Sequence, residues 1–252
     1  LPISTASGES TSFLDALFTA TSAVCVTGLI VVDTGSYWNM FGQTIIMILI
    51  EIGGLGFMSF TTLIAIILGK KITLRERLIL QDAMNTFNIQ GLVKMVKYVL
   101  VFTVSVQFFG ALLLSTQFIP EFGFGKGAFY SLFHSISAFC NAGFDVLGKG
   151  NSLISFNTNV VVIMVLSILI IIGGLGFTVW SELYTCKSIK RVSIHSKMVL
   201  LITTGLVVGG TLLMFLFEHN NPQTISKMSF INKLTNSFFA SVTPRTAGFN
   251  SI

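Results

Sequence analysis

Long stretches without a charged side chain constrain this sequence more than any other feature. No Asp, Glu, Lys or Arg occurs from Tyr98 to Pro120, from Gly150 to Ser181 or from Met198 to Phe217, and Glu51 stands alone between Phe41 and Gly69. Each window can supply the roughly 20 apolar residues with which an α-helix crosses a bilayer core. Only 10% of the chain is charged, where soluble domains carry about 25%. The sequence therefore predicts an all-α integral membrane protein with four spanning helices.

The basic residues lie mainly in the connections that follow the windows at residues 41–69 and 150–181. These two connections hold ten of the fifteen Lys and Arg residues against three acidic residues, whereas the other connections hold five basic and six acidic residues. By the positive-inside rule, the two basic connections face the cytoplasm. The pI of about 9.2 is then a consequence of topology, and no nucleic-acid partner is expected.

Residues that commonly carry enzyme chemistry are scarce. The sequence has no HExxH, GxSxG or Walker motif, so it is not expected to be an enzyme. Cys25, Cys140 and Cys186 are too few and too scattered for a disulfide framework or a zinc site. We expect each of them to be a buried thiol.

One six-residue sequence, Ile-Gly-Gly-Leu-Gly-Phe, occurs twice. It spans residues 52–57 and 172–177, a shift of 120, and each copy is expected inside a spanning helix that runs into a basic connection. Clustered glycines let helices approach closely in a membrane, so we interpret the motif as a packing element.

A second element occurs three times, at Thr21–Leu29, Ile136–Phe144 and Ser241–Phe249. In each copy a run of small and β-branched residues ends at a glycine. A short apolar stretch with helical spacing precedes each copy, and none of these stretches is long enough to cross a membrane. The pattern predicts a half-helix that enters from outside, followed by an extended segment that returns outward.

Extended backbone at membrane depth leaves its carbonyl groups unpaired, and this suggests what the loops bind. Unpaired carbonyl groups cost several kcal/mol each in hydrocarbon, so such backbone persists where it is buried in protein or lines a water-filled passage. Carbonyl oxygens turned toward that passage can replace the hydration shell of a potassium ion. Glycine lets the chain turn its carbonyl groups inward, and the C-terminal end of a half-helix favours a cation. We therefore predict an ion-conducting pore for potassium.

The order of span, loop and span divides the chain into repeats. Residues 1–93 form repeat 1 without its leading span, residues 94–196 form the complete repeat 2, and residues 197–252 form repeat 3 without its inward span. One filter ring needs about four such loops. We expect the sequence to be part of a longer protein whose fourth repeat and true N-terminus are absent, although a loop from another subunit is an alternative.

These loops, the repeated glycine motif and the topology together resemble the Trk/Ktr/HKT superfamily of potassium transporters, and most of all the membrane subunits of bacterial Ktr systems. The resemblance implies potassium-channel-like hairpins in a pseudo-fourfold arrangement. It implies that Gly28, Gly143 and Gly248 centre the filter loops. The residues that would offer the other ion-binding carbonyl groups are Val26, Thr27, Asn141, Ala142, Thr246 and Ala247.

The resemblance also implies partners and a location. The protein would be a homodimer in the bacterial cell (inner) membrane, seated on a cytosolic RCK-type ring that binds ATP or ADP. It would carry K⁺, with Na⁺ as a second candidate ion, and its gate would lie outside this sequence. Lys70–Arg77 and Lys187–Lys197 are candidate docking surfaces for the ring, or simply topology signals beside anionic membrane lipid.

Two ionisable residues stand out, one inside a predicted span and one inside a predicted loop. Glu51 is intramembrane, but repeat 2 has Ile171 in the matching place, so we expect Glu51 to form structural hydrogen bonds or to contact an adjoining cavity. Arg245 takes the place that cysteine holds in the other two loops. We expect it to bind carbonyl groups or a carboxylate behind the filter, because a cation in the permeation path would repel potassium.

Three other side chains have competing interpretations. Asp33 and Asp145 follow the first two loop glycines, so they either concentrate cations at the outer mouth or are solvated loop carboxylates. His134 lies on a half-helix and is expected to pack rather than to bind a ligand.

The main rival function is a secondary transporter whose glycines break helices around a midplane substrate site. Such transporters more often have inverted repeats and polar groups at mid-span. The repeats here run parallel, and Glu51 is the only charged residue at mid-span.

Overall fold

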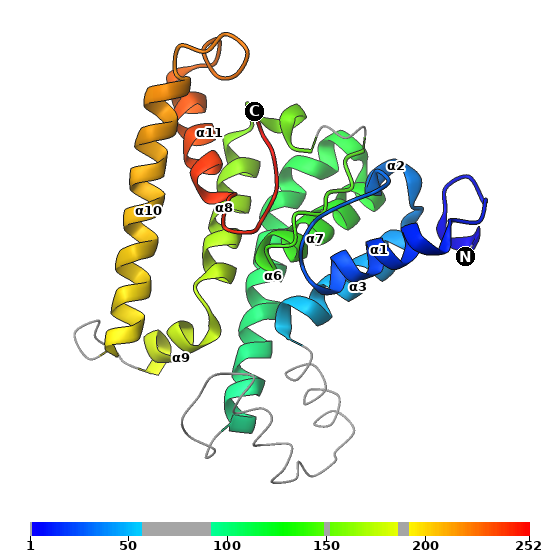
Figure 1. Cartoon of the computed structure of the whole chain (residues 1–252), viewed down its shortest axis with the longest axis horizontal. Coiled ribbons are helices and arrows are strands. Elements are labelled where there is room, and N and C mark those ends of the chain that lie inside the picture. The colour runs from blue at the N-terminus through cyan, green and yellow to red at the C-terminus, as the bar shows by residue number, and fades with distance from the viewer. Residues whose placement is uncertain (1, 57–91, 149–151, 186–191) are drawn as a thin grey trace.

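The structure, a computed structural model, describes residues 2–56, 92–148, 152–185 and 192–252, and every element named in these ranges is a helix. The all-α prediction is therefore confirmed for the described residues (Figure 1). The longer helices are α3 (Met40–Leu55), α6 (Leu92–Phe122), α8 (Val160–Gly174) and α10 (Ile194–Glu218). The shorter elements are η1 (Pro2–Ser4), α1 (Phe13–Val24), α2 (Thr34–Tyr37), α7 (Phe124–Phe139), η2 (Ile154–Phe156), α9 (Phe177–Thr185) and α11 (Phe230–Val242).

Two helices in the described ranges are long and apolar enough to cross a membrane unbroken. They comprise 26 residues of α6, Lys97–Phe122, and the 25 residues of α10. Each contains one of the uncharged windows of the sequence. Both run in the same direction, with their N-terminal ends low in Figure 1 and their C-terminal ends high. The second and fourth predicted spans are thus confirmed as continuous helices.

The third predicted span is broken. α8 and α9 together are long enough to cross a membrane, but they meet at an angle of 91°. The break falls at Gly176, whose φ of 86° is a left-handed value that ends an α-helix. The carbonyl group of Ile172, close to the break, accepts a hydrogen bond of 2.9 Å from the indole N–H of Trp180.

The first copy of the glycine motif also ends a helix. α3 stops at Leu55, and Gly56, with φ 78°, is its C-cap residue. The prediction that both copies of the motif lie inside a continuous span is therefore wrong, because the third glycine of each copy adopts a conformation that a helix cannot contain. α3 has 16 residues, and the remainder of its uncharged window lies outside the described residues.

The three predicted half-helices are confirmed as α1, α7 and α11, with 12, 16 and 13 residues. All are too short to cross a bilayer core. Ser12 and Ser229 cap two of them by accepting hydrogen bonds from the backbone N–H groups of Asp15 and Asn232. Capping thus defines the N-terminal start of α1 and α11, whereas α7 starts after Gly123 without a side-chain cap. Each of the three helices leads directly into one of the glycine loops.

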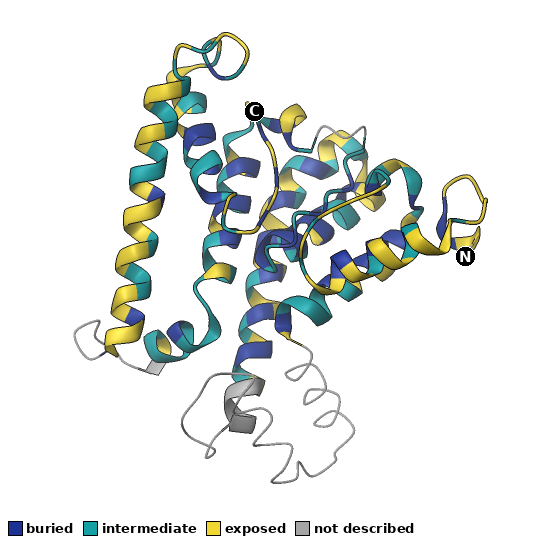
Figure 2. Ribbon diagram, in the orientation of Figure 1, coloured by how far each residue is buried: buried dark blue, intermediate teal, exposed yellow. Residues whose placement is uncertain are grey.

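The core surrounds α7, which packs against α3, α6 and α8 (Figure 1). Phe118, Phe133 and Leu166 are completely buried there. The outer face of α10, in contrast, is mostly exposed (Figure 2), and Leu201 and Phe217 are 75% and 76% exposed. An apolar exposed face along a helix of this length is typical of contact with lipid.

Candidate functional site: three glycine-centred loops

The three loops share one backbone conformation. Each has two left-handed residues, the glycine itself and the residue two positions before it. Left-handed backbone costs a non-glycine residue about 1–2 kcal/mol, so its presence at the same place in three loops requires support from the surroundings. The φ values are 55° at Val26, 72° at Gly28, 57° at Asn141, 70° at Gly143, 66° at Thr246 and 74° at Gly248.

One residue at the end of each half-helix holds its loop at two points. Its carbonyl oxygen accepts a hydrogen bond from the N–H just before the glycine, and its hydroxyl donates to the carbonyl group just after the glycine. The hydroxyl groups donate from Ser22 to Leu29 at 2.7 Å, from Ser137 to Phe144 at 2.7 Å and from Thr243 to Phe249 at 2.6 Å. The carbonyl groups of the same three residues accept from the backbone N–H groups of Thr27, Ala142 and Ala247, respectively.

The carbonyl groups that the sequence predicts as ion ligands remain unpaired. Within the described part of the chain, none of the nine accepts a hydrogen bond. Unpaired carbonyl groups are costly unless water or a ligand satisfies them. The nine residues are Val26, Thr27, Gly28, Asn141, Ala142, Gly143, Thr246, Ala247 and Gly248.

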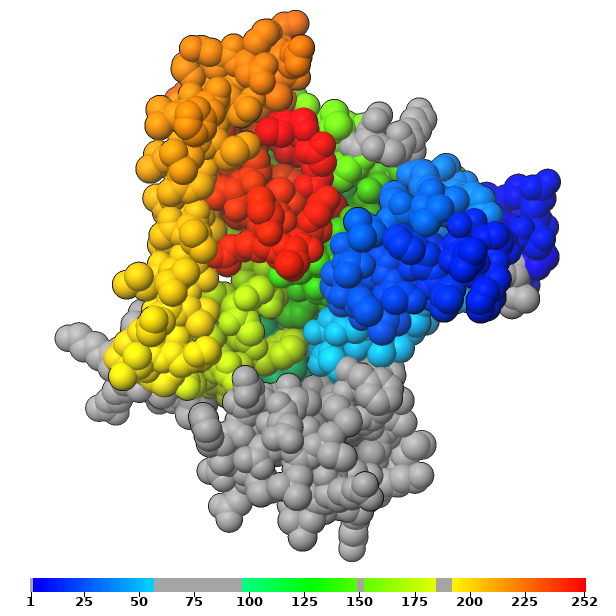
Figure 3. Space-filling view, in the orientation of Figure 1, coloured from blue at the N-terminus to red at the C-terminus, as the bar shows by residue number. Residues whose placement is uncertain are grey.

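The loops lie beside one another in chain order. A Cβ atom on Gly28 would collide with the carbonyl oxygen of Ala142, and one on Gly143 would collide with the carbonyl oxygen of Ala247. The N-terminal segment (blue) and the C-terminal segment (red) are neighbours on the face shown in Figure 3. All three loops line one cavity of about 590 Å³, formed by Cys25, Val26, Thr27, Leu29, Cys140, Asn141 and Thr246.

The first glycine of each repeated motif packs against the end of a half-helix. A Cβ on Gly53 would overlap the carbonyl oxygen of Val24, and one on Gly173 would overlap that of Phe139. Val24 and Phe139 both lie four residues before a loop glycine. The packing interpretation of the motif is therefore confirmed, and the close contact places both half-helices against the spans that follow them in the chain.

The third loop differs from the others in length and in its support. Thr243 lies five residues before its glycine, whereas Ser22 and Ser137 lie six residues before theirs. The guanidinium group of Arg245 donates a hydrogen bond of 3.2 Å to the carbonyl oxygen of Thr203 in α10. The expectation that Arg245 binds carbonyl groups is confirmed.

The second loop is supported by a carboxylate. Glu51 in α3 accepts a hydrogen bond of 2.7 Å from the side chain of Gln107 in α6 and one of 3.5 Å from the thiol of Cys140. Structural hydrogen bonding by Glu51 is therefore confirmed. Gln107 was not among the residues predicted from the sequence, although an amide at the middle of an uncharged window is a usable signal.

The two aspartates beyond the loops have different surroundings. Asp33 caps α2, where its carboxylate accepts a hydrogen bond of 2.9 Å from the backbone N–H of Ser36. Asp145 follows the second loop, and one of its oxygens is buried without a hydrogen-bond partner. Burial, together with the nearby charge of Asp33, raises the pKa of Asp145 to about 6, although a backbone hydrogen bond at Leu147 opposes the rise.

Two remaining predictions concern ligand-type side chains. His134 is completely buried, its Nδ1 lies 2.7 Å from the carbonyl oxygen of Tyr130, and its ring packs edge-on against Phe118, which confirms a packing role. Cys25 is exposed at the cavity, so the expected buried thiol is wrong there, because the residue ends a half-helix and faces open space. Cys186 lies outside the described residues, as do Lys70–Arg77 and residues 187–191 of the stretch Lys187–Lys197.

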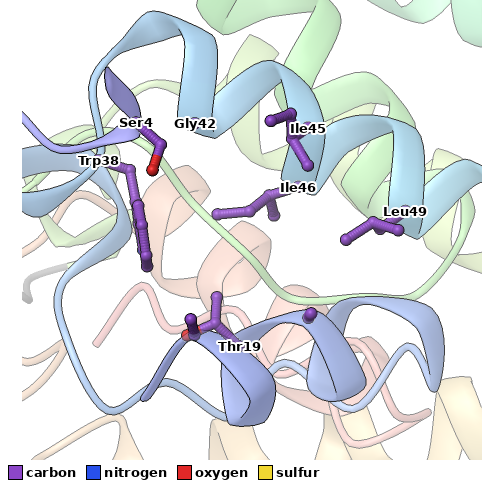
Figure 4. A pocket seen from close by; sticks show the side chains of 9 residues that line it. Ser4, Thr19, Trp38, Gly42, Ile45, Ile46 and Leu49 are labelled. Carbon is purple, nitrogen blue, oxygen red and sulfur yellow. The ribbon is translucent and has the colours of Figure 1, made fainter. Parts of the chain in front are cut away.

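A second, smaller cavity of about 100 Å³ lies between α1 and α3 (Figure 4). Trp38, Ile46 and Leu49 give it a mostly apolar lining, with hydroxyl groups from Ser4 and Thr19. This lining offers no set of oxygen atoms that could replace the water around an ion. The cavity between the loops is larger and more polar, so it is the better candidate site.

The whole chain is similar to known cation transport proteins. The sequence model of the TrkH family, described as cation transport protein, matches residues 2–252. The potassium/sodium uptake protein NtpJ of Enterococcus hirae is 52% identical over the whole chain. The Ktr system potassium uptake protein B is 47% identical in Bacillus subtilis and 39% identical in Vibrio alginolyticus, again over the whole chain.

The chain spans about half the length of these curated relatives. It covers 55% of the Enterococcus protein, 56% of the Bacillus protein and 55% of the Vibrio protein. The resemblance drawn from the loops and the glycine motif is confirmed, since both the family model and the relatives point to the same group of proteins.

Proposed function

Because this chain belongs to the TrkH family of cation transport proteins, we propose that it forms most of the ion pathway of a potassium uptake protein. The family consists of transport proteins, so the prediction that the chain is not an enzyme is confirmed. The relatives whose names include potassium uptake support potassium as the transported ion.

The observation that carries the proposal is a set of nine unpaired carbonyl groups in three adjacent loops, which all contribute residues to one cavity. Four of the nine residues, Val26, Thr27, Asn141 and Thr246, line that cavity. A potassium ion that enters the filter loses water, and carbonyl oxygens replace that water. The left-handed residues in each loop let successive carbonyl groups turn toward the ion. In this mechanism Gly28, Gly143 and Gly248 with their two preceding residues form the filter.

The half-helices add an electrostatic contribution. α1, α7 and α11 each end directly before a loop, so the negative end of each helix dipole lies close to the cavity. A helix C-terminus carries about half a negative charge and favours a nearby cation by roughly 0.3–1 kcal/mol. Three such ends would stabilise a potassium ion without an ionised ligand.

The three loops supply three sides of a pseudo-fourfold filter. The fourth would come from a repeat beyond residue 252, or else from a second subunit. The repeat boundaries at 1–93, 94–196 and 197–252 and a gate outside this sequence belong to the same proposal. The similar arrangement of half-helix, loop and glycine motif in the first two repeats supports it.

The proposed setting is the bacterial cell membrane. The basic connections would face the cytoplasm and the loops the outside. There the protein would form a homodimer on an RCK-type ring that binds ATP or ADP, with the basic connections as docking surfaces. The Ktr system named in the Bacillus and Vibrio relatives supports such a partner, and the Enterococcus relative's name supports Na⁺ as a second ion.

A secondary transporter remains the alternative, and the break between α8 and α9 is the observation that favours it. In such transporters, the backbone groups freed by a broken helix bind substrate or ion. Here the indole N–H of Trp180 already donates a hydrogen bond to the carbonyl group of Ile172 near the break, so this group is not free to bind a substrate. The pore is therefore the better supported function.

The test is tracer uptake by the full-length protein in liposomes. A potassium gradient would drive ⁸⁶Rb⁺ inward, with K⁺, Na⁺ and Li⁺ as competitors. We expect K⁺ and Rb⁺ to block uptake and Li⁺ to leave it unchanged. Absence of uptake with and without a cytosolic ring, or uptake coupled to an organic solute, would contradict the proposal.

A further inference from the structure

Glu51 contacts the start of the second loop but does not itself line the cavity. It is not among the residues that line the 590 Å³ cavity, whereas its hydrogen-bond donor Cys140 is. Cys140 directly precedes Asn141, the left-handed residue of the second loop. A change at Glu51 would therefore reach the ion through the backbone at Cys140 and Asn141.

The contacts join three elements at one point. Gln107 in α6 is 4% exposed, and its side-chain amide donates to Glu51 at 2.7 Å and lies 3.9 Å from the sulfur of Cys140. The backbone carbonyl group of Gln107 accepts a hydrogen bond of 2.7 Å from Ser135 in α7. α6 thus holds the half-helix through its backbone and the start of the loop through its side chain.

Close packing keeps this arrangement in place. Gly54, three residues after Glu51, lies so close to the side chain of Cys140 that a Cβ would overlap its sulfur. The cysteine can therefore move little toward α3. A buried hydrogen-bond network that is fully connected fixes the positions of its members, and removal of one partner leaves the others unsatisfied.

The other loops are supported differently. Repeat 2 has Ile171 in the place of Glu51, and the third loop uses Arg245 bonded to Thr203. In the first loop the corresponding cysteine, Cys25, is exposed. Within the part of the chain that the structure describes, only the second loop is therefore supported by a carboxylate in this way.

We infer that Glu51, with Gln107, is a positioning residue that sets the geometry of the second filter loop and so determines ion selectivity. The inference rests on the proposed function, because it assigns a role within the same pore. Glu51 does not bind the ion in this mechanism. It holds Cys140 so that the carbonyl groups of Asn141, Ala142 and Gly143 keep their spacing.

The test compares three variants of the full-length protein in ⁸⁶Rb⁺ uptake. Glu51→Ile copies the residue of repeat 2 and removes the acceptor. It should raise KM about tenfold and lower K⁺-over-Na⁺ selectivity by a similar factor, as expected for loss of a charge-assisted hydrogen bond. The maximal rate should change less. Glu51→Gln keeps an acceptor oxygen and should restore both values.

Gln117→Ala is the matched control. It removes another side-chain hydrogen bond of α6, with Asn159 at 2.9 Å, in a contact that includes no loop residue. Its KM and selectivity should equal those of the wild type. The same loss in the control as in Glu51→Ile would mean that general helix packing is responsible, which would overturn the inference.

A double variant tests whether the two residues act as one unit. Gln107→Leu alone should match Glu51→Ile, and the combination should be no worse than either, whereas independent sites would add. Gln107→Leu also carries the test if Glu51→Ile fails to fold. Wild-type selectivity in both single variants would overturn this inference alone, whereas absence of selective uptake by the wild type would overturn the proposed function.

Discussion

At the scale of single residues, a few polar groups determine whether the loops keep their shape. Ser22, Ser137 and Thr243 each form hydrogen bonds on both sides of a loop glycine, although the three loops differ in sequence. Such bonds contribute about 1 kcal/mol each, which is comparable with the cost of one left-handed residue. Each loop conformation therefore depends on one hydroxyl group at the end of a half-helix.

Asp145 gives a prediction about pH at this scale. Its pKa of about 6 in the folded protein lies above the ordinary value of 3.8, so folding favours the protonated form. The contribution of Asp145 to stability should be greatest at low pH and should fall by at most about 3 kcal/mol as pH rises through 4 to above 6. Asp145→Asn removes this loss.

We expect Asp145→Asn to raise the melting temperature of the full-length protein in detergent at pH 8, and much less at pH 4.5. Glu121→Gln, which removes an exposed carboxylate at the end of α6, is the control and should change neither value. An equal gain for Asp145→Asn at both pH values would show that burial and Asp33 do not shift this pKa.

At the scale of elements, the repeated glycine motif combines two tasks. Gly53 and Gly173 let a half-helix approach closely, and Gly56 and Gly176 end the helix. Both tasks require the absence of a side chain, the first for space and the second for a left-handed φ. These demands account for the first and third glycines of each copy of the motif.

Gly176→Ala tests the second task. No atom lies within 4 Å of a Cβ at this position, so the substitution adds backbone strain without a collision. We expect a loss of about 1 kcal/mol in unfolding free energy. Thermal or denaturant unfolding in detergent measures it.

Gly209→Ala is the control for this substitution, because it is helical, equally open and has no left-handed φ. It should be neutral or slightly stabilising. A loss equal to that of Gly176→Ala would mean that the break does not require glycine.

At the scale of the whole molecule, contacts between loops of different repeats build the cavity. Gly28 lies against Ala142, and Gly143 lies against Ala247. The absence of a side chain at each glycine therefore lets the next loop pack closely against it. These contacts join residues more than 100 positions apart in the sequence. The spacing of the filter is therefore a property of the assembled repeats.

Gly143→Ser tests this assembly. The substitution places a side chain on a left-handed residue and against the carbonyl oxygen of Ala247. We expect K⁺-over-Na⁺ selectivity to fall at least about tenfold, because the strain alone is worth about 1–2 kcal/mol, while the protein still inserts and assembles. Competition in ⁸⁶Rb⁺ uptake by the full-length protein measures the ratio.

Gly205→Ser is the matched control, since Gly205 lies on the exposed face of α10 with nothing within 4 Å. It should leave selectivity unchanged. Unchanged selectivity in Gly143→Ser itself would contradict the assignment of the second loop to the filter.

The sequence by itself determined the membrane class, the half-helices and the places of the loops. Uncharged windows and glycine spacing are local properties, and hydrocarbon imposes the same demand on any chain of this composition. The interpretations of Glu51 and Arg245 as hydrogen-bonding residues also came from local context, because a lone charge among apolar residues needs a partner.

Only the tertiary structure decided the break between α8 and α9, the exposure of Cys25 and the role of Gln107. The last two depend on which residues of distant segments meet, and composition does not specify that. Glycine permits a left-handed φ but does not require one, so the glycine motif alone does not specify that the helix breaks at Gly176. The common cavity arises in the same way, from contacts between loops that are far apart in the chain.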